Sequence, residues 1–220
     1  MTWESIDLFQ LTADRLQSLV VTIYTIAMQE LERAYANLFD QVDEEIAAAS
    51  DESKHEDLTQ YRWSLDYEKK EQVRSLAAMA LAMLGSLIDS FLDEARKEMN
   101  KTHPATKKDY AGKSVLLKRV TEFQDRFQID LTRINGFATV QEIILARHSC
   151  IHGGCAPSED YLKQTKCRML DDDKKINLTL GQLKELVAET SDFAKVLYQH
   201  LATARAENRK VLAGGSVEQN

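Results

Sequence analysis

The chain has 220 residues, of which 44% are hydrophobic, enough for one substantial domain with a continuous core and too few for three domains. Its formal net charge of −7 argues against a protein that coats duplex nucleic acid through its overall field, although a local cluster of basic side chains can hold RNA. Two prolines and eight glycines leave few turn residues, so we expect an all-α protein, an antiparallel helical bundle of about five helices.

The first half of the chain predicts two long helices joined by a polar connection. Apolar residues recur at steps of three and four from residue 12 to about residue 49, which predicts one long amphipathic helix. Residues 50–70 are polar and acidic, and we expect a loop that runs into the next helix. Residues 71–99 are the most hydrophobic stretch, and their wide apolar arc predicts a central buried helix.

The second half predicts three further helices, at residues 113–128, 139–152 and 180–208. A loop at residues 100–112 precedes them. Gly136 separates the first two, and Gly153-Gly154 ends the second, because glycine is the usual residue just past a helix C-terminus. A charged loop up to residue 175 and a short extended piece at residues 176–179 lead into the last helix.

These elements suggest an organisation in three parts. Residues 1–65 form the N-terminal long helix and the acidic loop, residues 66–208 form a helical domain packed with it as one globular unit, and residues 209–220 form a disordered tail. The first residues lack the basic start and the apolar run of a signal peptide, and the longest apolar stretch, residues 76–88, is shorter than a membrane span. We therefore expect a cytoplasmic protein with no membrane partner. Its three cysteines fit reduced thiols without a bridge.

Arg147 stands among apolar residues of the predicted helix 139–152. On an ideal helix it projects into the middle of a stripe formed by Val140, Ile143, Ile144 and Ile151. A guanidinium is rarely buried unless a carboxylate or a phosphate satisfies it. Arg147 therefore has a structural acidic partner, with Asp89 and Asp93 as the nearest candidates, or it borders a polar cleft.

His148 and His152 are four residues apart, so they share one face of the last helical turn, about 100° or more round the helix from Arg147. Histidine exchanges protons near neutral pH and arginine stabilises a phosphorane-like dianion, which are the two requirements of metal-independent RNA cleavage by the 2′-hydroxyl. The histidines and the cysteines match no standard zinc-site spacing, so we predict neither a metal nor a cofactor.

Residues 142–153 resemble the signature of HEPN domains, which is an arginine, a polar residue, and a histidine after four to six intervening positions near the end of a helix. In this resemblance Arg147 and His152 correspond to the paired motif residues, and His148 takes the polar position. Gly154 stands where one subgroup has a tyrosine that a partner nucleotidyltransferase modifies, so the sequence gives no support for that regulation. The resemblance extends over residues 71–205 and leaves the first 65 residues uncovered.

HEPN proteins are helical and generally pair, so that two motifs line a cleft between subunits. Many are endoribonucleases of toxin–antitoxin or antiviral defence systems. The resemblance therefore implies a metal-independent endoribonuclease that acts as a homodimer on an RNA substrate, with Arg147, His148 and His152 as catalytic residues and 2′,3′-cyclic phosphate products. It also implies an antitoxin or defence protein as a possible partner. The alternative is a non-catalytic HEPN-like module that binds a nucleotide or mediates assembly, since other members have lost catalysis.

Overall fold

A computed structural model describes residues 4–101 and 115–214 of the chain. These residues form six α-helices and one short 3-10 helix, and they contain no β-strand. The elements are α1 (Glu4–Ala48), α2 (Glu52–Asn100), α3 (Val115–Phe127), η1 (Leu131–Arg133), α4 (Phe137–Gly153), α5 (Glu159–Gln164) and α6 (Leu180–Gly214). The predicted all-α bundle of about five helices is confirmed.

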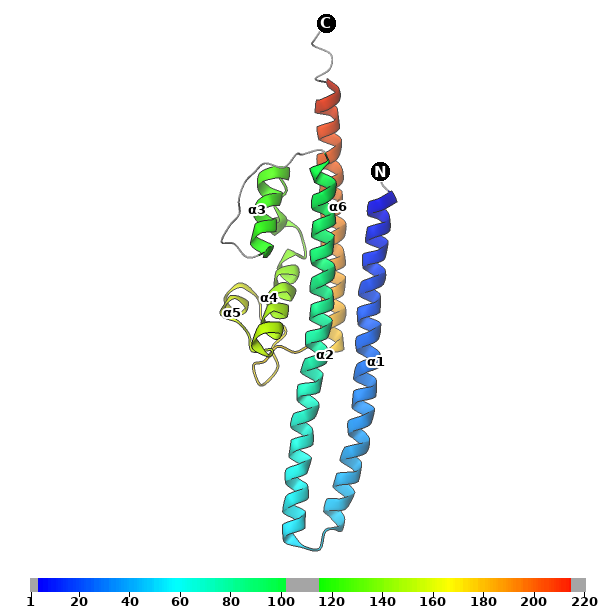
Figure 1. The fold of residues 1–220 in the computed structure, drawn as a ribbon, viewed down its shortest axis with the longest axis vertical. Helices are drawn as coiled ribbons and strands as arrows, with labels where there is room; N and C mark the ends of the chain where they lie inside the picture. Colours follow the sequence, from blue (N-terminus) through cyan, green and yellow to red (C-terminus); the bar gives the residue numbers. More distant parts are fainter. Residues whose placement is uncertain (1–3, 102–114, 215–220) are drawn as a thin grey trace.

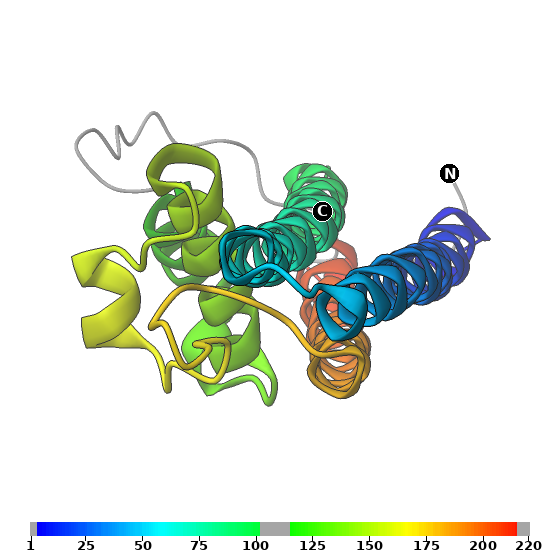
Figure 2. The same cartoon turned by 90° about the horizontal axis from the view of Figure 1, so that it is seen from below.

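The three long helices set the shape of the molecule. Figure 1 shows α1 and α2 side by side and antiparallel, with α6 packed against both along the half where α1 begins. Seen along the long axis in Figure 2, α1 lies on one side of α2, and α3, α4 and α5 lie on the other. Because α4 contacts both α2 and α6, the main hydrophobic core fills the space between these three helices.

The ends of α1 and α2 that meet at their connection project beyond the other helices as a two-helix arm (Figure 1). The arm has its own small core, made by Tyr35, Val42 and Leu65 with Leu31, Phe39 and Ile46 around them. The Arg62 guanidinium lies 3.6 Å from the centre of the Phe39 ring, a cation–π contact across the two helices.

The predicted acidic loop at residues 50–70 is wrong, because α2 begins at Glu52 and only residues 49–51 lie outside helices there. Glutamate and lysine are good helix formers, so acidic character alone does not indicate a loop. Leu65 supplies the buried contact with α1 that stabilises this polar segment as a helix. The side chain of Asp51 caps the helix by accepting a hydrogen bond from the backbone N–H of Ser53.

The predicted central helix at residues 71–99 is confirmed as the second half of α2, whose buried residues include Ala77, Leu81, Leu84, Ile88 and Leu92. An 18-residue window of α2 has a mean hydropathy of 1.7, so by length and composition this helix could cross a membrane. This differs from the expectation that the longest apolar stretch, residues 76–88, is shorter than a membrane span. In the fold, 44% of that window is buried, and the core helix of a soluble protein passes the same test.

Helix α1 begins at Glu4, earlier than predicted, and only part of its apolar pattern is buried. Val20 and Tyr24 face the core, whereas Leu16, Leu19, Ile23 and Ile26 are exposed. The hydroxyl group of Tyr24 donates a hydrogen bond to the carbonyl oxygen of Leu178, and burial raises the pKa of Tyr24 to about 12. Tyr24 thus attaches α1 to the segment that leads into α6.

Several boundaries in the second half differ from the prediction. Helix α6 continues to Gly214, so residues 209–214 are helical and not a disordered tail, while residues 215–220 lie outside the described part. The division after residue 65 falls inside α2, which runs unbroken across it. Most of the predicted loop 100–112 lies outside the described residues.

The predicted charged loop before residue 175 contains one more helix, α5. It begins where the Ser158 hydroxyl accepts a hydrogen bond from the backbone N–H of Tyr161, and the Tyr161 side chain is fully buried. The predicted extended piece, residues 176–179, makes one isolated antiparallel bridge, between Ile176 and Leu170. This short bridge returns the chain to the start of α6.

Candidate functional site at the end of α4

Helix α4 carries all three sequence-predicted site residues on its last two turns. The predicted end at Gly153-Gly154 is confirmed, because α4 stops at Gly153 and Gly154 adopts a left-handed conformation with φ of 57°. A residue with a Cβ is strained in that conformation, so glycine suits this position. The helix end that follows His152 is therefore fixed by the sequence itself.

His148 and His152 lie together on the exposed side of this helix end. Their ring centroids are 4.7 Å apart and the ring planes meet at 53°. Both side chains are exposed to solvent. The expectation that they share one face is confirmed, and the result is two titratable rings in contact at an open surface.

Arg147 points instead toward α2. Its Nη1 atom lies 2.9 Å from Oδ2 of Asp89, which is one of the two acidic partners expected for a structural arginine. The other, Asp93, pairs with Arg119 of α3. The side chains of Arg147 and Asp89 are 29% and 39% exposed, so this ion pair is at the rim of the helix interface and reaches solvent.

The expected position of Arg147 in the middle of the buried stripe is wrong. Ile151, which was expected in that stripe, is 55% exposed. The buried face of α4 is formed by Val140, Ile143, Ala146 and Cys150. Because α4 packs on α2 and α6 through this face, Arg147 lies at its edge.

Gly85 of α2 provides the space through which Arg147 reaches Asp89. A Cβ atom on Gly85 would lie 2.6 Å from Cδ of Arg147, closer than real Cβ atoms approach other atoms. The Nε atom of Arg147 is buried and has no hydrogen-bond partner among the described residues. The guanidinium is therefore held by one ion pair and by close packing over a glycine.

The structure brings the two histidines together but does not bring Arg147 to them. Within residues 4–101 and 115–214, no hydrogen bond or ion pair joins Arg147 to His148 or His152. Residues five apart on a helix are separated by about 140° around its axis, which is consistent with this divergence. In one chain Arg147 lies against α2, and the histidines face solvent.

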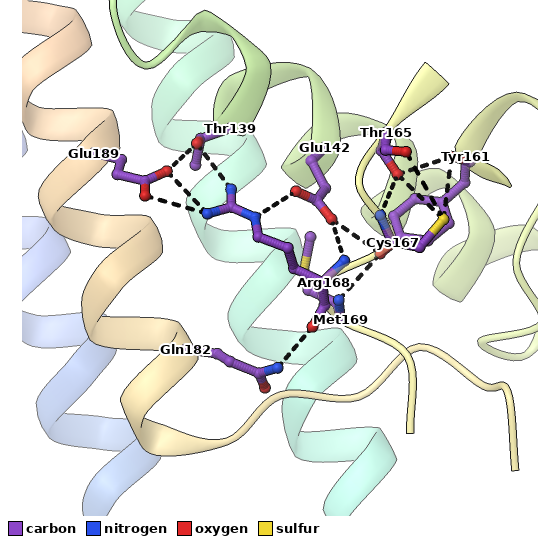
Figure 3. Close-up of polar contacts among 9 residues, drawn as sticks. All are labelled: Thr139, Glu142, Tyr161, Thr165, Cys167, Arg168, Met169, Gln182 and Glu189. Atoms are coloured by element: carbon purple, nitrogen blue, oxygen red, sulfur yellow. Dashed lines mark hydrogen bonds and ion pairs between the residues drawn. The ribbon is translucent and has the colours of Figure 1, made fainter. Parts of the chain in front are cut away.

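A buried polar network lies at the beginning of α4 (Figure 3) and was not predicted. The Glu142 carboxylate, 2% exposed, accepts hydrogen bonds of 2.8 Å from the backbone N–H and from Nε of Arg168. It also accepts a 3.3 Å hydrogen bond from the Tyr161 hydroxyl. Arg168 reaches on to Glu189 of α6 and to Thr139. The network therefore joins α4, the segment after α5, and α6.

The ionisation of this network follows from its partners. The pKa of Glu189 is lowered, first by the hydrogen bond from the Thr139 hydroxyl and then by Arg168. Burial by itself lowers the pKa of Arg168, but the Glu142 and Glu189 carboxylates outweigh it and raise that pKa. Burial raises the pKa of Tyr161. The sequence contains one sign of this network, a charged residue, Glu142, among the apolar residues Val140 and Ile143 of the predicted helix. The same kind of sign, a charge among apolar residues, drew attention to Arg147.

A second ionic cluster fixes the loop between α5 and α6 on α2. The buried side chain of Arg74 donates hydrogen bonds to Asp171, Asp173 and Glu71, and Lys175 also pairs with Glu71. The bond from Lys175, followed by that from Arg74, lowers the pKa of Glu71. This cluster therefore fixes on α2 the loop whose Ile176 N–H hydrogen-bonds the Cys155 carbonyl oxygen, just after the end of α4.

The three cysteines are free. The Sγ atoms of Cys150 and Cys155 lie 2.6 Å apart and both side chains are buried, whereas the sulfur of Cys167 lies 3.7 Å from the Thr165 hydroxyl oxygen. In the described ranges, no group of three or more His, Cys, Asp or Glu residues is arranged to hold a metal ion.

Comparisons with protein-family models, with curated proteins and with solved structures found no match to this chain.

Proposed function

We propose that this protein is a metal-independent endoribonuclease of the HEPN type that acts as a homodimer. The exposed pair His148 and His152, in contact at the end of α4, carries the proposal. The two adjacent titratable rings lie on an open surface, and the residue before His148 is Arg147, which reaches solvent. Proton transfer and phosphate binding are the chemistry that these groups offer.

In the proposed reaction the 2′-hydroxyl of the RNA attacks the adjacent phosphorus, and the leaving group is the 5′-oxygen of the next nucleotide. His152 moves the proton from the 2′-hydroxyl or to the leaving oxygen, and His148 orients the phosphate or its partner histidine. Arg147 neutralises the charge that develops on the phosphate. The products carry a 2′,3′-cyclic phosphate and a 5′-hydroxyl, and no metal ion takes part.

The divergence of Arg147 from the histidines supports a dimer. One chain presents its arginine at the α2 contact and its histidines to solvent, so a second copy has to complete the set of groups around one phosphate. The net charge of −7 implies that RNA is held by this local cluster, with binding that weakens as salt is added.

A second candidate function, a non-catalytic helical module that binds a nucleotide or mediates assembly, is favoured by the ion pair between Arg147 and Asp89. This pair neutralises the charge of the arginine without any phosphate, through a single contact of its Nη1 atom. In this second candidate Arg147 stabilises the contact between α4 and α2 and does not bind the scissile phosphate.

RNA cleavage in the presence of EDTA separates the two candidates. We expect the wild-type protein to cleave single-stranded RNA, and His152→Ala to lose about two orders of magnitude in rate, the usual contribution of a general acid or base. His200 is an exposed histidine of α6, so His200→Ala is the matched control and should retain full activity. Because His152 is exposed, its loss leaves the core intact and a fall in rate is not a folding defect.

Two results would contradict the proposed cleavage, and a third would contradict the proposed dimer. One is cleavage by His152→Ala at the wild-type rate, which would point to a contaminating nuclease. The other is a wild-type protein that binds RNA in EDTA and leaves it uncut, which would favour the non-catalytic module. Light scattering that shows a monomer at micromolar concentration would count against the shared site.

A further inference from the structure

The sulfur atoms of Cys150 and Cys155 are held against each other by the turn that follows α4. Cys150 is on the last turns of the helix, and Cys155 follows its left-handed cap at Gly154. Cys155 is itself in the left-handed region, with φ of 65°, and its carbonyl oxygen accepts a 2.8 Å hydrogen bond from the backbone N–H of Ile176. This turn directs the Cys155 side chain back into the core, where the two Sγ atoms lie 2.6 Å apart.

Among the described residues, Cys150 and Cys155 belong to no group of three or more side chains that could hold a metal ion. Both cysteines are free and buried, and the residues between and after them, Gly153, Gly154 and Ala156, are exposed. Cys167 is on a separate part of the loop, with its sulfur near the backbone of Tyr161. The pair is therefore one surface turn away from solvent, and local opening of that turn exposes it.

The two thiols are chemically unequal. A hydrogen bond with Cys150 lowers the pKa of the Cys155 thiol, and the same contact, followed by burial, raises the pKa of the Cys150 thiol. The thiolate is the nucleophile in thiol–disulfide exchange, so this difference favours Cys155 as the residue that attacks first.

We propose that Cys150 and Cys155 are a redox-active dithiol, a modification site that a low-molecular-weight disulfide converts into an internal disulfide bridge. The Cys155 thiolate attacks one sulfur of the small disulfide, forms a mixed disulfide and releases one small thiolate. The Cys150 thiolate then attacks the Cys155 sulfur, closes the bridge and releases the second. The protein loses two electrons and two protons, and the small disulfide becomes two thiols.

The bridge would close a ring around the end of α4 that contains His152. Because the sulfurs are in contact in the reduced protein, oxidation requires little change in the helices. This inference does not depend on RNA cleavage, since it concerns only the state of the two thiols. Its failure would leave the proposed activity untouched.

The test is equilibration of the full-length protein with glutathione disulfide, followed by N-ethylmaleimide in denaturant and mass spectrometry of tryptic peptides. Trypsin cuts after Arg147 and Lys163, so residues 148–163 carry both cysteines in one peptide. We expect this peptide to lose both maleimide adducts and two hydrogens in mass. Cys167→Ser should form the same bridge, whereas Cys150→Ser should carry glutathione on Cys155.

Two outcomes would overturn the inference. One is a wild-type peptide that retains both maleimide adducts at the most oxidising ratio. The other is a persistent glutathione adduct on Cys150 or Cys155 in place of the bridge. The same equilibration in guanidinium chloride gives the unfolded reference, and the bridge should be at least about tenfold more favoured in the native chain, because the fold holds the two sulfurs together.

Discussion

Replacement of Arg147 by lysine tests the role of this residue most directly, because the substitution keeps the charge and removes the planar guanidinium. The ammonium group of a lysine can still pair with Asp89, which accepts one hydrogen bond from Arg147 at 2.9 Å. It cannot bind two phosphate oxygens side by side, since it acts as a point charge on a flexible stem. Stability and activity should therefore respond very differently.

The structure sets the expected size of each response. Both partners of the ion pair reach solvent, with side chains 29% and 39% exposed, and partly exposed pairs of this kind contribute about 1 kcal/mol or less. For a chain of this length such a loss lowers Tm by about 2–4 °C at most. The loss of one preorganised contact with the transition state costs on the order of 3 kcal/mol, or about two orders of magnitude in rate.

Thermal unfolding and RNA cleavage in EDTA should be measured on the same Arg147→Lys preparation. The expected result is a small change in Tm with a large fall in cleavage rate. A variant that is clearly destabilised but cleaves RNA in proportion to its folded fraction would refute the catalytic role and leave Arg147 as a structural partner of Asp89.

Three further predictions follow from the packing around this site. Gly85→Ala should change the free energy of unfolding by less than about 1 kcal/mol, because the helix-propensity gain offsets the displacement of Arg147, yet it should lower cleavage. Gly181→Ala is the control, because a Cβ there would make only an ordinary contact, 3.8 Å from the Thr179 hydroxyl oxygen. Glu142→Gln should cost about 2 kcal/mol in urea unfolding, because a buried carboxylate that accepts three hydrogen bonds is neutralised, whereas the exposed Glu185→Gln should change little. The pKa values of Glu71 and Glu189 are lowered in the fold by their hydrogen-bonded partners. The stability that these two carboxylates add to the folded protein is therefore present above their ordinary pKa of 4.5 and is lost as the pH falls below it. A Tm that stays constant from neutral pH down through this range would contradict the two ionic clusters.

The fold could be predicted where the sequence carries a periodic apolar signal. The buried half of α2 and the start of α6 at Leu180 are correct for that reason. The prediction of a loop for the acidic segment 50–70 is wrong, because two paired helices need only a narrow apolar stripe between them and their other faces are polar. Helix α5 is not predicted, because its six residues are too few to show a helical apolar period. The one local sign of this helix in the sequence is Ser158, which caps its N-terminus.

The sequence predicts which candidate site residues share a face of one helix, but it does not predict their contacts with other helices and turns. Helical spacing placed His148 and His152 on one face correctly, since i and i+4 are neighbours on any α-helix. Which acid pairs with Arg147 depends on how α2 crosses α4, and the sequence could only offer Asp89 and Asp93 together. The contact between Cys150 and Cys155 depends on a left-handed turn at a non-glycine residue, for which the sequence has no reliable signal.

Helix α2 determines much of the geometry at the end of α4. Gly85 and Asp89 are one helical turn apart, so the position that admits the Arg147 side chain and the carboxylate that binds its end lie on the same face of α2. The close approach of the Arg147 side chain to α2 requires a glycine at position 85, and a glycine inside a helix destabilises it relative to alanine. This loss of stability is offset only by the contacts of Arg147. An exposed ion pair contributes about as much as that glycine costs, so stability alone gives little reason for the arrangement. A use for the guanidinium at the solvent-exposed rim, such as binding phosphate, would supply one.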